Sequence, residues 1–248
     1  MSENDANARF IRESIVEPSP IARARAHAIE LGASPISAAV GSQIAVLAAA
    51  TGARSIVEIG TGAGVSGLWL LRGAPQAVLT SIDNEPEHLA AARQAFSDAR
   101  VAPTKARFIT GRAADVLPRM NEASYDIVLV DADPENVIDY VEHGLRLVRT
   151  GGMVLVPRIL GGGRVADPVQ RDEVTSAYRS LVQETQESSA VLATVSSSGE
   201  GLLQLISVGE GWLSRRHPAQ TEEGDGSMIR RPLRESACAN SSSLRRAS

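Results

Sequence analysis

Residues 57–66, with the sequence VEIGTGAGVS, decide the fold that this chain is expected to adopt. They join a short apolar stretch, residues 55–59, to a second apolar stretch, residues 65–72, through a turn with glycine at positions 60, 62 and 64. Residues 62–67 also match the pattern G-x-G-x-x-G, which in dinucleotide-binding folds lies between a strand and a helix. The stretch therefore predicts a strand, a ligand-binding turn and a helix, in that order.

The flanking segments repeat this alternation. Strands are predicted at residues 77–82, 106–109, 125–130 and 153–156, and helices at residues 38–51, 86–99, 113–120 and 137–148. Several of these strands are continuously apolar, which is typical of a parallel sheet covered by helices on both faces. A long helix within residues 165–186 and an antiparallel hairpin of residues 190–196 and 201–208 complete the predicted sheet.

The predicted fold class is therefore α/β, with a doubly wound, Rossmann-like, seven-stranded sheet over residues 36–210. Residues 1–35 are expected to form N-terminal cap helices: residues 1–9 frayed, and a helix over residues 10–31 that breaks at the two prolines of residues 18–20. Residues 211–248 are rich in Ser, Arg, Gly and Pro, and we predict that they form a disordered tail.

Composition excludes several classes of protein. The single cysteine, Cys238, rules out an intramolecular disulfide and a zinc site made of several thiolates. The only lysine is Lys105, and the net charge of −4 argues against nucleic acid as a partner. No targeting segment is seen, and no apolar stretch approaches the roughly 20 residues that span a bilayer. We therefore expect a cytoplasmic protein with no membrane partner.

Two acidic residues indicate which ligand the turn binds. Asp83 ends the next predicted strand, about 20 residues after the turn, where a carboxylate accepts hydrogen bonds from a ribose diol. On this evidence alone, NAD is a fair prediction. Glu58 precedes the first glycine by two residues and would repel a pyrophosphate, whereas a ligand with a cationic amino group would be attracted.

The same residues resemble a known family. The stretch VEIGTGAGVS is similar to the first motif of S-adenosylmethionine-dependent methyltransferases, and more narrowly of O-methyltransferases of the catechol and caffeoyl-CoA type. Further matching stretches are IDNEPEH (residues 82–88), VDAD (residues 130–133) and GRVADP (residues 163–168). The resemblance covers residues 36–208, and the chain is especially similar to mycobacterial O-methyltransferases of this type.

The resemblance implies S-adenosylmethionine as the cofactor and assigns residues to its parts. Glu58 and the glycine turn would hold the methionine portion, and its carboxylate would be bound by Ser66 and a backbone group of Ile36. Asp83 would bind both ribose hydroxyls. Asn84 and Ala113 would lie beside the adenine. The complete set of expected cofactor-binding residues is Ile36, Glu58, Gly60, Thr61, Gly62, Ser66, Asp83, Asn84, Ala113, Asp131 and Asp133.

The chain departs from the family where catalysis takes place. The family uses a divalent cation and a lysine, but Pro134 stands at the position of the lysine, and Pro157 and Arg158 replace an Asp-Asn pair of metal ligands. Proline has no side-chain oxygen and arginine repels a cation, so we expect no metal ligands and no divalent cation. Asp131 is the candidate base, and Arg158 is expected to stabilise the acceptor oxygen in place of the metal.

The sequence thus predicts an O-methyltransferase that acts on a small molecule. Two alternatives stay open: a cofactor-binding protein with little or no catalysis, and an NAD-dependent oxidoreductase. The resemblance suggests a homodimer. His27, His88 and His217 have no ligand-like spacing and are interpreted as structural or solvated.

Overall fold

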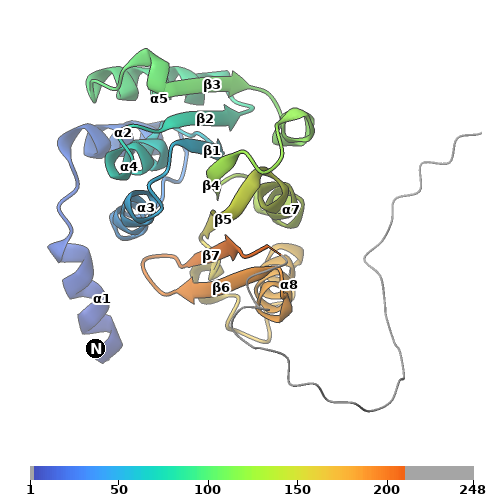
Figure 1. The fold of residues 1–248 in the computed structure, drawn as a ribbon. Helices are drawn as coiled ribbons and strands as arrows, with labels where there is room; N and C mark the ends of the chain where they lie inside the picture. Colours follow the sequence, from blue (N-terminus) through green and yellow to red (C-terminus); the bar gives the residue numbers. More distant parts are fainter. Residues whose placement is uncertain (1–2, 210–248) are drawn as a thin grey trace, which may run out of the picture.

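The computed structural model describes residues 3–209, and the predicted tail, residues 211–248, lies outside them. Figure 1 shows the order of the elements along the chain. The helices are α1 (Glu3–Ser14), α2 (Ser19–Glu30), α3 (Ala38–Ala50), α4 (Val65–Gly73), α5 (Pro86–Asp98), α6 (Ala113–Val116), α7 (Val137–Leu147) and α8 (Glu173–Glu187). The strands are β1 (Ser55–Ile59), β2 (Val78–Asp83), β3 (Ala106–Thr110), β4 (Tyr125–Val130), β5 (Val148–Pro157), β6 (Val191–Ser196) and β7 (Leu202–Ser207). Short 3-10 turns are η1 (Pro103–Lys105), η2 (Leu117–Arg119), η3 (Pro134–Asn136) and η4 (Gly161–Gly163).

The strands form one seven-stranded sheet with the order β3-β2-β1-β4-β5-β7-β6. The first five strands of this order are parallel, and β7 pairs antiparallel with both β5 and β6. The doubly wound sheet and its closing antiparallel hairpin are thus confirmed. The order reverses between β1 and β4, which is the point where open α/β sheets bind ligands beyond the carboxyl ends of their strands.

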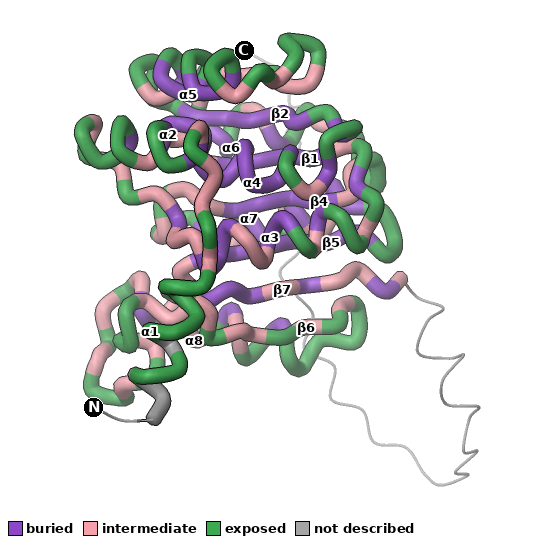
Figure 2. The backbone as a smooth tube through the Cα atoms, turned by 90° about the vertical axis from the view of Figure 1, so that its left-hand side faces the viewer, coloured by how far each residue is buried: buried purple, intermediate pink, exposed green. Residues whose placement is uncertain are grey.

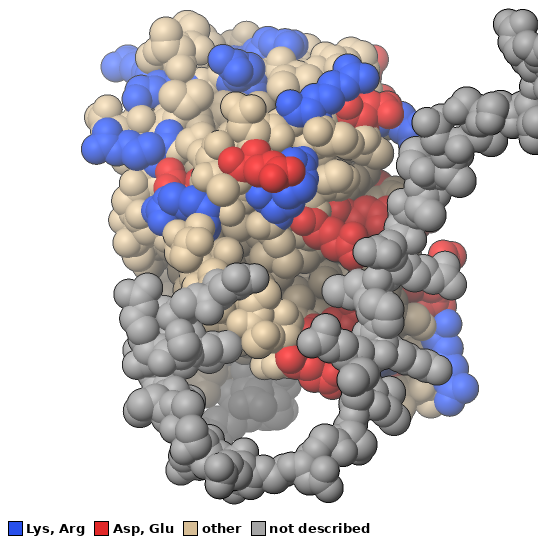
Figure 3. Space-filling model, turned by 45° about the vertical axis from the view of Figure 1, so that its right-hand side comes forward, with Lys and Arg blue, Asp and Glu red and all other residues tan. Residues whose placement is uncertain are grey.

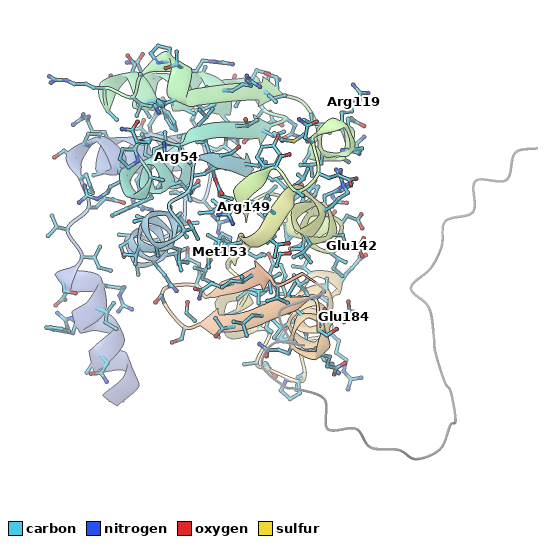
Figure 4. All side chains as sticks on the ribbon, in the orientation of Figure 1. Arg54, Arg119, Glu142, Arg149, Met153 and Glu184 are labelled. Carbon is cyan, nitrogen blue, oxygen red and sulfur yellow. The ribbon has the colours of Figure 1, made fainter. Side chains whose placement is uncertain are left out.

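Two apolar cores lie on opposite faces of the sheet. One joins the sheet to α2, α3, α4 and α5 and includes Met153 of β5, which Figure 4 labels. The other joins the sheet to α7 and α8. Figure 2 shows the central strands buried along most of their length, whereas α5 and α2 are buried on one side only. Residues 1–35 remain a predicted cap, although Ile21 and Ala24 of α2 belong to the first core.

Several boundaries differ from the predicted ones. Residues 3–9, which were expected to be frayed, belong to the first helix, which runs from Glu3 to Ser14. Residues 15–18 have no regular structure, and Pro18 is extended and precedes the first residue of α2. The helix predicted at residues 113–120 is shorter because Pro118, which lacks an N–H, turns its end into η2. Strand β5 begins earlier than predicted, since Val148 already pairs with Tyr125 of β4 before a register shift.

The surface of the described residues has two further features. Figure 1 shows α1 standing apart from the sheet at the end of an extended connection, and its Phe10 is 72% exposed. In Figure 3, arginine and lysine side chains are interspersed with acidic and uncharged ones over the visible face and form no continuous basic surface there. Within residues 3–209, no helix has the length and apolar character needed to cross a membrane.

Candidate active site

A cavity of about 490 Å³ lies at the carboxyl ends of β1, β2 and β4, where the strand order reverses. The end of α2 and the loop that follows it cover part of this cavity with Ala28, Ala33, Ser34 and Pro35. Most of the expected site residues line it: Gly60, Thr61, Gly62, Ser66, Asp83, Asn84, Ala113, Asp131, Asp133 and Arg158. Ile36 and Glu58 do not line the cavity.

The glycine turn passes between two strand ends. The N–H of Gly60 donates to the carbonyl of Ile82, and the N–H of Asp131 donates to the carbonyl of Ile59. Gly60 has φ +90°, and a Cβ at this position would overlap the backbone carbonyl of Asp131. Only glycine fits here, because a side chain would meet both a strained backbone and a rigid neighbour.

Glu58 connects the helix after the glycine turn to strand β2. Its carboxylate is fully buried and accepts hydrogen bonds from the hydroxyls of Ser66 (2.6 Å) and Ser81 (2.5 Å). Burial raises the pKa of Glu58 to about 8, against the effect of these two hydrogen bonds. Alternation along β1 directs this side chain toward α4 and away from the cavity lining, so the expected contact between Glu58 and the amino group of a ligand stays a prediction. The hydroxyl proton of Ser66 is also committed to Glu58 rather than to a ligand.

Ile36 lies behind the cap loop. Its side chain is fully buried, and its carbonyl accepts a hydrogen bond from Arg25 of α2 (2.6 Å). The N–H of Ser37 donates to Glu200, which lies between β6 and β7 (2.8 Å). The backbone near this position thus binds the protein itself, and residues 33–35 face the cavity in place of Ile36.

Asp83, the last residue of β2, accepts hydrogen bonds from the glycine turn. One carboxylate oxygen, Oδ2, accepts from the N–H groups of Thr61 and Gly62, both at 2.9 Å. The other oxygen, Oδ1, accepts from the N–H of Glu85 (2.9 Å) and lies 3.5 Å from Nδ1 of His88. His88 also lines the cavity, although the spacing of the histidines along the sequence did not indicate a ligand-binding position. Its position on the first turn of α5, five residues after Asp83, was a usable signal in the sequence.

Asp131 and Arg158 form an ion pair at the other end of the cavity. Asp131 follows β4 and Arg158 follows β5, and the Arg158 side chain donates to Asp131 and to the carbonyl of Ser34. Burial raises the pKa of Asp131 to about 7; the charge of Arg158 lowers it in part, and Glu200 raises it. Arg158 has φ +62°, a left-handed conformation that costs a non-glycine residue about 1–2 kcal/mol. Such strain persists where the surrounding structure holds the residue in place.

Asp133 faces two donors on the chain that follows it. It accepts a hydrogen bond from the side chain of Asn136 and another from the hydroxyl of Tyr140 (3.0 Å). Burial and the contact with Asp133 raise the pKa of Tyr140 to about 12, so that this hydroxyl stays a neutral donor. Tyr140, Asn136 and Arg112 line the cavity and were not anticipated from the sequence. Their positions depend on how α6 and α7 pack, which local pattern does not encode.

The donor set does not suit a hard divalent cation. Such a cation needs several oxygen ligands, but the Asp131 carboxylate is paired with Arg158, and Pro157 beside it has no side-chain oxygen. Among the described residues, no three His, Cys, Asp or Glu side chains are grouped as a metal site would require. The guanidinium of Arg158 supplies the positive charge beside Asp131.

Comparison with known proteins identifies the family. The family model described as O-methyltransferase matches residues 19–207. The chain belongs to this O-methyltransferase family. The protein named "Probable O-methyltransferase Rv1220c" from Mycobacterium tuberculosis is 45% identical over 194 residues, which are 78% of this chain and 87% of that protein.

Solved O-methyltransferase structures share the fold. TomG from Streptomyces achromogenes, an O-methyltransferase of tomaymycin synthesis solved with S-adenosylmethionine, superimposes with a TM-score of 0.74 at 28% identity. The match covers 84% of this chain and all of TomG (100%). The Bacillus cereus O-methyltransferase, solved with S-adenosylhomocysteine, gives a TM-score of 0.69 at 25% identity over 82% of this chain and 97% of that one. This chain is thus an O-methyltransferase with the Rossmann-like sheet of its family.

Proposed function

We propose that this enzyme transfers a methyl group from S-adenosylmethionine to an oxygen of a small molecule without a divalent cation. The observation that carries the proposal is the ion pair of Asp131 and Arg158. It places a fixed positive charge beside the candidate base, at the position where the family is expected to hold its metal. The proposal combines family membership, which supports the reaction, with this pair, which distinguishes the chain within the family.

The cavity suits the cofactor. Its volume of about 490 Å³ lies in the range of small-molecule sites. Asp83 and Asn84 at the end of β2 and Ala113 at the start of α6 would hold the nucleoside, and the turn at Gly60 and Gly62 would hold the methionine portion. When bound, the cofactor supplies an electrophilic methyl group on a sulfonium. TomG and the Bacillus cereus enzyme, solved with this cofactor and its product, support the assignment.

In this proposal, Asp131 would remove the proton from the acceptor hydroxyl. A base with a pKa of about 7 is both available and able to take a proton near neutral pH. Arg158 would stabilise the negative charge that develops on the acceptor oxygen, because its guanidinium has N–H groups beyond those that contact Asp131 and Ser34. The proton then passes from Asp131 to solvent. Orientation of the acceptor supplies much of the remaining rate.

Calorimetric titration of S-adenosylmethionine, once with Mg²⁺ and once with EDTA, tests the cofactor and the cation. We expect the same affinity in both. Production of S-adenosylhomocysteine from a panel of phenols, catechols and carboxylic acids then tests turnover, with Arg158→Ala as the variant and Arg149→Ala, a surface residue that Figure 4 labels, as its control. Turnover that requires Mg²⁺, or that is unchanged in Arg158→Ala on every acceptor, would contradict the proposed mechanism.

The alternatives predict other outcomes. Binding of S-adenosylmethionine without turnover of any acceptor would favour a protein of this family that binds the cofactor with little catalysis. The family match already argues against the oxidoreductase alternative. A homodimer in the cytoplasm stays part of the proposal. The exposed Phe10 and Ile11 of α1 and Val16 after it are consistent with a contact to a second copy, and light scattering of the purified protein would test it.

A further inference from the structure

The carboxylate of Asp83 is already largely occupied by the protein. A carboxylate offers about four acceptor positions, two on each oxygen. The N–H groups of Thr61 and Gly62 fill both positions on Oδ2, and the N–H of Glu85 fills one on Oδ1. One acceptor position on Oδ1 therefore remains. A ribose has two neighbouring hydroxyls, so the remaining position on Oδ1 accommodates one of them, and the other would have to share an oxygen that the protein already uses.

His88 lies beside that remaining position. Its Nδ1 is 3.5 Å from Oδ1 of Asp83, and the ring lines the same cavity. The side chain is 24% exposed, so it is partly held in place before a ligand binds and loses less freedom on binding. Asn84 also lines the cavity but is exposed, and fixing it would cost more side-chain entropy.

We propose that His88 binds one hydroxyl of the cofactor ribose while Asp83 binds the other. This inference rests on the proposed function, since it assigns a residue to the nucleoside of the same cofactor. An imidazole suits this place because its ring nitrogen either donates to a hydroxyl oxygen or accepts from a hydroxyl. The two hydroxyls are bound by two residues because Oδ2 of Asp83 already accepts hydrogen bonds from the glycine turn. The shape of the turn therefore affects how the ribose is recognised.

Calorimetry with S-adenosylhomocysteine and its 2′-deoxy and 3′-deoxy analogues tests the proposal. We expect His88→Ala to weaken the affinity for S-adenosylhomocysteine about 3- to 10-fold, the usual effect of one hydrogen bond. For the analogue that lacks the hydroxyl bound by His88, wild type and variant should agree within about twofold. The matched control is His27→Ala, an exposed histidine on α2 outside the cavity, which should leave all affinities unchanged.

The outcomes separate this inference from the proposed function. If the wild-type protein does not bind S-adenosylhomocysteine, the proposed function fails. If the wild type binds and His88→Ala binds equally well, or loses the same factor for all three ligands, the assignment of His88 to the ribose is overturned. Thermal unfolding without ligand checks that each variant is folded, and His88→Asn, which keeps a polar side chain, provides the same comparison if the alanine variant is unstable.

Discussion

Replacing Arg158 with alanine should destabilise the protein much more at pH 8.5 than at pH 6. Burial raises the pKa of Asp131 to about 7, so its native form binds a proton more tightly than the unfolded chain does. Stability is therefore lost as the pH rises from the ordinary range of an aspartate to about 7. At pH 6 Asp131 is mostly protonated and Arg158 contributes little. At pH 8.5 it is ionised, and Arg158 offsets the cost of a buried charge.

The magnitude follows from the pKa and the assay pH. An arginine in contact lowers the pKa of an aspartate by about 1–3 units, so its removal should raise the pKa of Asp131 by a similar amount. One pKa unit corresponds to about 1.36 kcal/mol. At pH 8.5, about 1.5 units above the wild-type pKa of Asp131, the variant can therefore lose at most about 2 kcal/mol of unfolding free energy through this change in pKa. The Arg158 side chain is 30% exposed, and solvent screens part of the attraction. We therefore expect an extra loss of about 1–2 kcal/mol at pH 8.5 and almost none at pH 6.

Urea unfolding of wild type and variant at both pH values measures this difference. Alanine keeps a side chain at φ +62°, so the backbone strain of this position is shared by both proteins. The control is Arg149→Ala, which breaks the ion pair with Asp126. Backbone and arginine hydrogen bonds lower the pKa of Asp126 despite its partial burial, so that it is ionised at both pH values and this variant should show no pH effect.

A second variant tests whether the carboxylate of Asp131 causes the pH dependence. In an Asp131→Asn background, Arg158→Ala should cost the same at pH 6 and at pH 8.5, because no titrating carboxylate remains beside it. Equal destabilisation by Arg158→Ala at both pH values in the wild-type background would contradict the proposed effect of Arg158 on Asp131. A pH-dependent loss that persists after Asp131 has been replaced would contradict it as well.

Three further predictions use thermal, chemical and spectroscopic measurements. Gly60→Ala should lower the stability by more than about 3 kcal/mol, because overlap of the added Cβ with rigid backbone adds to the left-handed strain. Gly62→Ala, whose Cβ meets no atom within 4 Å, should cost only the strain of about 1–2 kcal/mol, and equal losses on thermal unfolding would contradict the role of the turn. Glu58→Gln should flatten the decline in stability between about pH 5 and pH 8, since the raised pKa of about 8 makes the native state lose stability as the pH rises; an unchanged slope in urea unfolding would count against burial as the cause. Asp133→Asn should lower the pKa of Tyr140, because the negative charge beside its hydroxyl is removed. Ultraviolet titration of tyrosinate measures this pKa, and an unchanged value would count against the contact as a cause.

Local patterns in the sequence were enough to predict the sheet. Apolar stretches separated by glycine and proline indicated each strand. In the structure, Ser37 caps α3, because its side chain accepts a hydrogen bond from the N–H of Val40. Element ends were predicted less well where a distant partner decides them, as at β5, which starts at Val148 because β4 pairs with it. The carboxyl ends of parallel strands meet at one edge, so acidic residues that end strands could be expected together.

The amino-acid sequence alone is enough to predict the fold class, the glycine turn and the meeting of Asp83 and Asp131 at one cavity, because these follow from local periodicity and from the geometry of parallel sheets. The tertiary structure alone decided what each carboxylate does there. Burial behind the turn gave Glu58 a structural contact with Ser66, and packing of the cap loop placed Arg158 between Asp131 and Ser34. Desolvation and contact between distant segments depend on the packed chain, and no spacing along the sequence encodes them.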